Sequence, residues 1–135
     1  MTIAGALAGC ASRPQIHSTT QHRAFSLKAN DLESHGLAFI TPSTVTTQEE
    51  DKQALAFTFA ETLIKERPAI KCVTLSETLG AINQNGLSEA YKLMFEEYHY
   101  TGILRHDVLR KIGDVTGSRY VAQLKLAGFR QDSDS

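Results

Sequence analysis

The sequence predicts an α/β fold in which strands and helices follow the order β-α-β-α-α-α-β. Three observations support this prediction. Short apolar runs rich in β-branched residues are bounded by Gly or Pro, longer segments repeat apolar residues at helical spacing, and 135 residues with 41% hydrophobic content suffice for one core. Strands separated by helices pair in parallel through right-handed crossovers. We therefore expect a small, mainly parallel sheet with helices packed on it.

The three strands are expected at residues 36–42, 69–75 and 119–126. Gly36 and Pro42 bound the first apolar run, as is typical of a buried strand. A three-stranded parallel sheet is thin, and few residues follow the third strand. We expect a domain truncated before further strands; the alternative is a sheet edge covered by a partner.

The first helix is expected to follow a threonine-rich loop and to end before Pro68. Thr46 with Glu49, and Thr47 with Glu50, both match the capping-box spacing. The apolar positions that share one face of this helix are Ala56, Phe59, Ala60, Leu63 and Ile64.

Three further helices are expected before the last strand. Ser76 and Ser88 are the expected N-caps of the first two, and the fourth helix of the chain is expected from about Arg105 to Thr116. The glycines expected to end the three helices are Gly86, Gly102 and Gly117. The clearest amphipathic stripe comprises Leu87, Ala90, Tyr91, Met94, Phe95 and Tyr98. We expect Tyr91, Met94, Phe95 and Tyr98 to pack against the sheet, with an exposed protein interface as the alternative.

The N-terminus differs sharply in composition from the rest of the chain. Residues 1–10 are apolar and small and are expected to be a signal-peptide remnant, and the sequence becomes polar from Arg13. Leu7-Ala8-Gly9-Cys10 resembles the lipobox of bacterial lipoproteins. The resemblance implies cleavage before Cys10, acylation of that cysteine and, because no Asp follows it, retention in the outer membrane on its periplasmic face. The alternative is an apolar N-terminus with a buried free cysteine.

Residues 11–35 are expected to be a flexible polar linker, 36–130 the α/β domain, and 131–135 a disordered tail. The linker contains His17 and His22, and His35 stands at its end. A flexible segment without clustered acids or cysteines is a poor metal cage, so we expect no metal there.

The C-terminal half carries a family resemblance. A helix with apolar residues and two glycines leads into a strand that begins with a bulky residue, at Leu109, Ile112, Gly113, Thr116, Gly117, Tyr120 and Val121. This pattern resembles the curli-secretion lipoproteins, the lipoprotein activators of peptidoglycan synthases and the N-terminal domain of the Tol-system β-propeller protein. The resemblance implies a non-catalytic, envelope-associated domain that binds a protein partner or assembles with itself.

Composition and motifs bear on the other function classes. A net charge of −1 lacks the basic excess typical of nucleic-acid binders, and no Gly-rich nucleotide motif is present, so we expect neither nucleic acid nor a cofactor. The alternative to a binding component is a small periplasmic enzyme, or an anion- or nucleotide-binding protein, using the loop after the first strand. The hydroxyl-bearing residues of that loop are Ser43, Thr44, Thr46 and Thr47.

Overall fold

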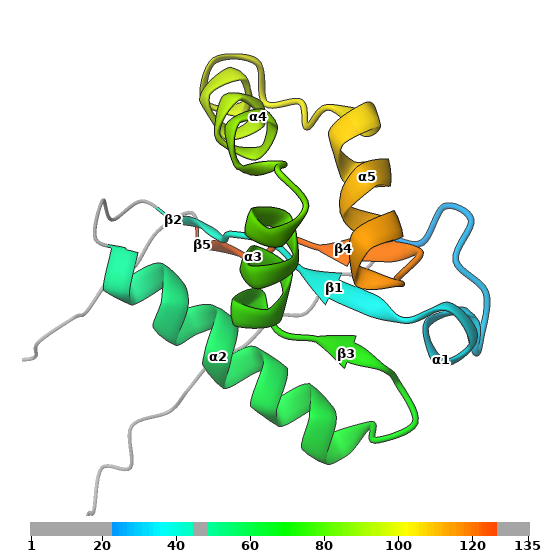
Figure 1. The fold of residues 1–135 in the computed structure, drawn as a ribbon. Coiled ribbons are helices and arrows are strands. Elements are labelled where there is room, and N and C mark those ends of the chain that lie inside the picture. Colours follow the sequence, from blue (N-terminus) through cyan, green and yellow to red (C-terminus); the bar gives the residue numbers. More distant parts are fainter. Residues whose placement is uncertain (1–22, 45–48, 127–135) are drawn as a thin grey trace, which may run out of the picture.

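The structure is a computed structural model that describes residues 23–44 and 49–126. The helices within these ranges are α1 (Asp31–His35), α2 (Glu49–Glu66), α3 (Leu75–Gln84), α4 (Ser88–Thr101) and α5 (His106–Thr116). The strands are β1 (Leu37–Phe39), β2 (Ser43–Thr44), β3 (Cys72–Val73), β4 (Tyr120–Ala122) and β5 (Lys125–Leu126). Figure 1 shows their arrangement.

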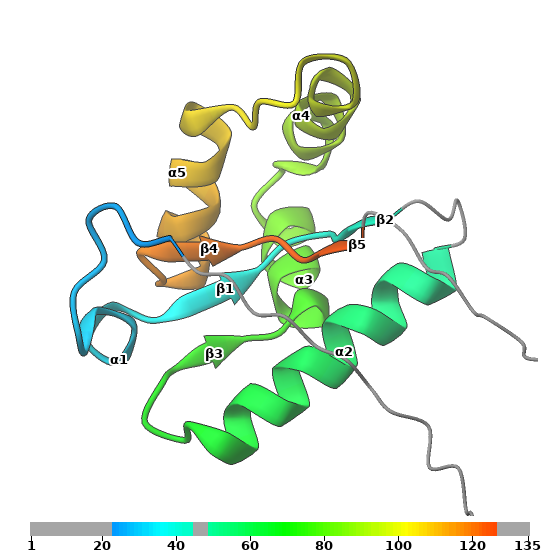
Figure 2. The ribbon, with the colours of Figure 1, turned by 180° about the vertical axis from the view of Figure 1, so that it is seen from behind.

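The predicted α/β class is confirmed. A parallel three-stranded sheet has the order β3-β1-β4, with helices packed on it, and β2 pairs in parallel with β5. From β1 the chain moves to one neighbour through α2 and then crosses to the other through α3, α4 and α5. Right-handed crossovers in opposite directions place their helices on opposite faces of a sheet. Accordingly, α3 and α5 stand in front of the sheet in Figure 1 and behind it in Figure 2.

The core consists of two clusters, because the alternating side chains of β1 point to opposite faces. One cluster combines strand residues with α2 and the start of α3, and its buried members are Leu37, Phe39, Ala56, Ala60, Ile70 and Leu75. The other cluster combines the residue directly after β1 with residues of α3, α4 and α5. Its buried members are Ile40, Ile82, Tyr91, Met94, Val108 and Ile112. β1 is therefore covered on both faces.

The first and third expected strands lie side by side, but each is split into two. Phe39 is paired with Ala122, whereas Ser43 is paired with Lys125, so the first strand contains one extra residue between the two pairings. This is a β-bulge. Pro42 lies within it and has no N–H to donate to a ladder.

Two helix caps differ from those expected. Thr74, not Ser76, caps α3: its extended backbone follows β3 directly, its hydroxyl accepts the Glu77 N–H at 3.3 Å, and the Glu77 carboxylate accepts the Thr74 N–H at 2.8 Å. Ser88 is the first helical residue of α4, and Leu87 occupies the cap position without a side-chain bond. The expected glycine ends are confirmed by positive φ angles of 67°, 69° and 69° at Gly86, Gly102 and Gly117.

The part expected to be linker is shorter than predicted. α1 lies inside the range 11–35, and Leu32 packs against the first core cluster. The Gly36 N–H closes the helix on the Leu32 carbonyl at 2.9 Å, and Glu33 pairs with Arg67 at 3.2 Å. The prediction of a flexible linker is thus wrong for residues 31–35, because one apolar side chain and these bonds dock the turn. The expected signal-peptide remnant, the tail at 131–135 and residues 11–22 of the linker lie outside the described residues.

The apolar face expected on the first helix is narrower than predicted. Ala56 and Ala60 are buried, but Phe59 and Ile64 remain 48% and 44% exposed. The rings of Phe59 and Phe39 form a T-shaped pair, with centroids 6.0 Å apart. The two alanines allow α2 to approach the sheet closely, and the bulkier residues flank that contact.

Candidate functional site

A hollow of about 750 Å³ lies where β1 leads into β2, at the carboxyl edge of the sheet. It brings together residues that the sequence singled out for different reasons, namely Ser43 from the expected anion-binding loop and Tyr91, Phe95 and Tyr98 from the aromatic helix. The carboxyl edge is where open α/β sheets place their ligands.

Tyr91 connects α4 to the loop that follows β1. Its hydroxyl oxygen accepts the Thr41 N–H at 2.9 Å and lies 2.7 Å from the Thr41 hydroxyl. Burial raises the pKa of Tyr91, and the bonds from Thr41 oppose part of that rise. The Phe95 ring meets Tyr91 edge-on, with centroids 4.9 Å apart. These contacts hold the wall of the hollow in place.

The interface alternative is wrong for two of its four residues. Tyr91 is only 8% exposed and Met94 is fully buried, because both side chains fill the second core cluster. Phe95 and Tyr98 are half-buried and line the hollow. These two residues alone retain surface for a ligand or partner.

Charged side chains surround the hollow in nearly equal numbers. Lys52 pairs with Glu49 at 2.8 Å, and Lys92 lies 4.0 Å from Glu96. Lys125 lines the same hollow from β5 and has no ion-pair partner within residues 23–44 and 49–126. Most of the positive charge is thus already paired with acids.

The remaining predicted site residues are only partly placed. Thr44 is the last residue of β2, beside Ser43. Thr46, Thr47 and the two expected capping boxes lie outside the described residues, as does the expected lipidation site Cys10.

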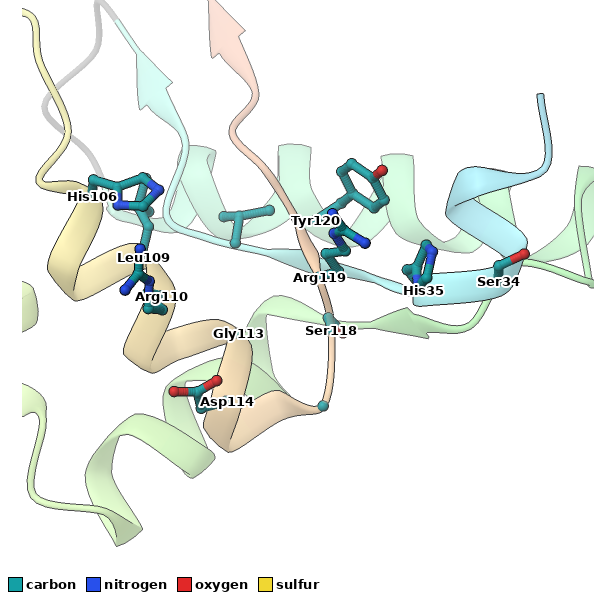
Figure 3. A pocket seen from close by; sticks show the side chains of 12 residues that line it. Ser34, His35, His106, Leu109, Arg110, Gly113, Asp114, Ser118, Arg119 and Tyr120 are labelled. Carbon is teal, nitrogen blue, oxygen red and sulfur yellow. The ribbon is translucent and has the colours of Figure 1, made fainter. Parts of the chain in front are cut away.

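A second groove, of about 990 Å³, was not predicted from the sequence. It runs between α5 and the outer edge of β4 (Figure 3). α5 contributes His106, Arg110 and Asp114, while Arg119 and His35 lie on the opposite side. The spacing of four residues between His106, Arg110 and Asp114 places them on one helical face, and that spacing was the available sequence signal.

Ser118 lies in the turn between α5 and β4 and also lines this groove. It is 4% exposed, and its hydroxyl has no hydrogen-bond partner in the described part of the chain. The Ser118 carbonyl lies against Gly113 so closely that a Cβ there would approach it to 2.7 Å. Gly113 thus permits the turn after α5 to lie close against the helix.

A third, largely apolar groove of about 530 Å³ lies between α2 and the start of α3. Phe57, which is 64% exposed, and Ile64 line it from α2, and Leu75 and Leu79 line it from α3. It adds an apolar surface on a part of the molecule distinct from both polar hollows.

The free cysteine lies in surroundings that disfavour reactivity. Cys72 is a free, half-buried thiol in β3, and burial raises its pKa, which disfavours a reactive thiolate. Across the described ranges, no group of three or more His, Cys, Asp or Glu side chains is arranged to hold a metal ion. None of the helices there is long and apolar enough to cross a membrane.

Comparisons with known proteins give no family. No protein-family model, curated protein or solved structure matches this chain. Its function is therefore inferred from its own residues.

Proposed function

We propose that this chain is a lipid-anchored component of the bacterial cell envelope, held at the periplasmic face of the outer membrane, that binds a protein partner or assembles with itself and is not an enzyme. The observation that carries the anchor is Leu7-Ala8-Gly9-Cys10 at the end of an apolar segment, followed by a polar stretch and then a folded domain. Several acyl chains on Cys10 would anchor the protein stably in the membrane, whereas a single acyl chain binds a membrane only marginally.

The domain surface supports the binding role. Large apolar side chains project from α2 and from the end of α4, with Phe57 64%, Tyr100 85% and Ile103 70% exposed. Aromatic residues are enriched at protein interfaces. Each exposed side chain would lose its contact with water when a partner covers it.

The experiment that tests the anchor compares the two cysteines. The chain is expressed with its native upstream region in a Gram-negative host, followed by membrane fractionation and intact mass measurement. We expect the wild-type protein in the membrane fraction, with a mass that matches cleavage before Cys10 and added acyl chains. Cys10→Ala should abolish both the mass shift and membrane retention.

Cys72→Ala is the matched control, because Cys72 lies in β3 within the folded domain. It should leave acylation and fractionation unchanged. An unmodified wild-type chain in the soluble fraction that retains Met1 would contradict the proposal.

A second candidate function is anion binding at the hollow beside Ser43. It is favoured by one observation: Lys125 lines the hollow and has no ion-pair partner in the described part of the chain. If this function is correct, inorganic phosphate should shift the backbone amide resonances of Thr41, Ser43 and Thr44 saturably, and Lys125→Gln should weaken that binding. Titration with sodium chloride at equal ionic strength is the control, and equal shifts with both salts would exclude a phosphate site.

A further inference from the structure

The outer edge of β4 presents unpaired backbone groups. Within the described residues, β1 is the partner strand of β4, and no strand pairs with its other side. The Tyr120 N–H donates to Gly36 at 3.3 Å, and the Ala122 carbonyl accepts the Ile40 N–H at 3.0 Å. Because consecutive residues of a strand point their backbone groups to alternate edges, the N–H and carbonyl of Val121 point away from β1.

Val121, which carries these groups, lines the groove between α5 and β4. Tyr120 lines the groove from the same strand, and Leu109 lines it from the helix (Figure 3). Its volume of about 990 Å³ is at the upper end of the range for ligand sites, which leaves room for several residues of extended chain. Unpaired strand edges of this kind are templates for an added strand.

The charged side chains that line the groove determine the charge of the ligand that it favours. Arg110 on α5 and Arg119 beside β4 bring two guanidinium groups to the groove, and His35 and His106 also line it. Asp114 is the one acidic residue among the lining side chains. Neither arginine belongs to an ion pair in the part of the chain that the structure describes. The groove therefore favours carboxylates.

We propose that the groove between α5 and the free edge of β4 binds an extended acidic peptide segment of a partner protein, which joins the sheet as a further strand beside β4. Backbone bonds to Val121 would supply affinity, and Arg110 and Arg119 would select alternate acidic side chains. Because it concerns the folded domain alone, this proposal holds or fails independently of acylation at Cys10.

The charge requirement is tested with the full chain and a fluorescein-labelled peptide of about eight residues, the length of an ordinary strand, alternating Val and Asp. Fluorescence anisotropy should show saturable binding that weakens as salt is added. The matching Val-Lys peptide should not bind. Equal binding of the two peptides, or no saturable binding of the Val-Asp peptide, would overturn the proposal.

Variants of the protein locate the site. Arg119→Glu and Arg110→Glu should each weaken the Val-Asp peptide by at least about tenfold, because each reverses a charge that faces a carboxylate. Lys65→Glu on α2 makes the same charge change on an exposed residue outside the groove and should leave affinity unchanged. Far-UV circular dichroism verifies that each variant is folded. Equal effects of all three changes would indicate attraction by net charge alone and refute the site.

Strand addition is tested without altering the protein. Two isomers of the Val-Asp peptide carry N-methyl groups on alternate residues, one isomer on the Val amides and the other on the Asp amides. Only one set of N–H groups can face β4, so one isomer should lose binding while the other keeps it. Equal affinity of the two isomers would refute strand pairing even if the charge dependence held.

Discussion

Gly113 is a residue at which the absence of a side chain lets the chain turn closely against the end of a helix. A Cβ there would approach the Ser118 carbonyl to 2.7 Å, and that carbonyl is backbone that cannot swing away. We expect Gly113→Ala to destabilise the protein by about 1–3 kcal/mol, as overpacking usually does. Urea denaturation followed by circular dichroism measures the change.

Gly80 in α3 is the matched control for this substitution. A Cβ at Gly80 meets nothing within 4 Å, so Gly80→Ala should gain about 0.5–1 kcal/mol from helix propensity alone. If both substitutions stabilised the protein, the close contact between Gly113 and Ser118 would not exist in solution.

Tyr91 links the stability of the protein to pH. Its pKa is raised by burial, so the folded state opposes ionisation that the unfolded chain permits near pH 10. The contribution of Tyr91 to stability is therefore fully present below about pH 10 and is lost as the pH rises through the folded-state pKa. We expect the wild type to lose more unfolding free energy than Tyr91→Phe between neutral pH and about pH 11.

At neutral pH, Tyr91→Phe should cost about 1 kcal/mol, because the Thr41 N–H loses its acceptor. Tyr100→Phe is the control, because Tyr100 is 85% exposed. This substitution should change neither the unfolding free energy at neutral pH nor the loss of unfolding free energy at alkaline pH. Parallel pH profiles for the wild type and the Tyr91 variant would contradict the buried environment of Tyr91.

At the scale of a single element, the capping box of α3 is the clearest local device. Thr74→Ala removes the hydroxyl that accepts the Glu77 N–H and should cost about 1 kcal/mol in unfolding free energy, measured by urea denaturation. Ser76 is the second residue of α3, so Ser76→Ala should leave the unfolding free energy unchanged. A larger loss for Ser76 than for Thr74 would place the cap where the sequence first suggested it.

The displaced caps show what element boundaries depend on. Thr74 and Ser76 are both good N-cap residues, so propensity cannot choose between them. The choice follows from β3, which ends at Val73 and leaves Thr74 in an extended conformation. The ends of α3, α4 and α5 were predictable because a left-handed residue at a helix end favours glycine wherever the strands lie.

At the scale of the whole molecule, the order of elements was predictable and the closeness of distant residues was not. Alternation of apolar strands with amphipathic helices predicted the parallel sheet and the buried stripe that includes Tyr91 and Met94. The groove beside β4 joins His35 to residues 106–121, and the hollow beside Ser43 joins α2 and α4 to β2 and β5. No sequence period encodes such contacts, because they depend on register and on the direction of each crossover.

The sequence by itself determined the α/β class, the sequence of strands and helices, and the glycine helix ends, because hydrophobic period and backbone sterics act over a few neighbouring residues. Only the tertiary structure decided that Pro42 lies in a bulge, that Phe59 stays half-exposed and that two arginines line the groove beside β4. The reason is physical: strand register and helix approach result from many weak contacts between residues far apart in the chain, and a single small residue such as Ala56 or Gly113 can determine which of them form.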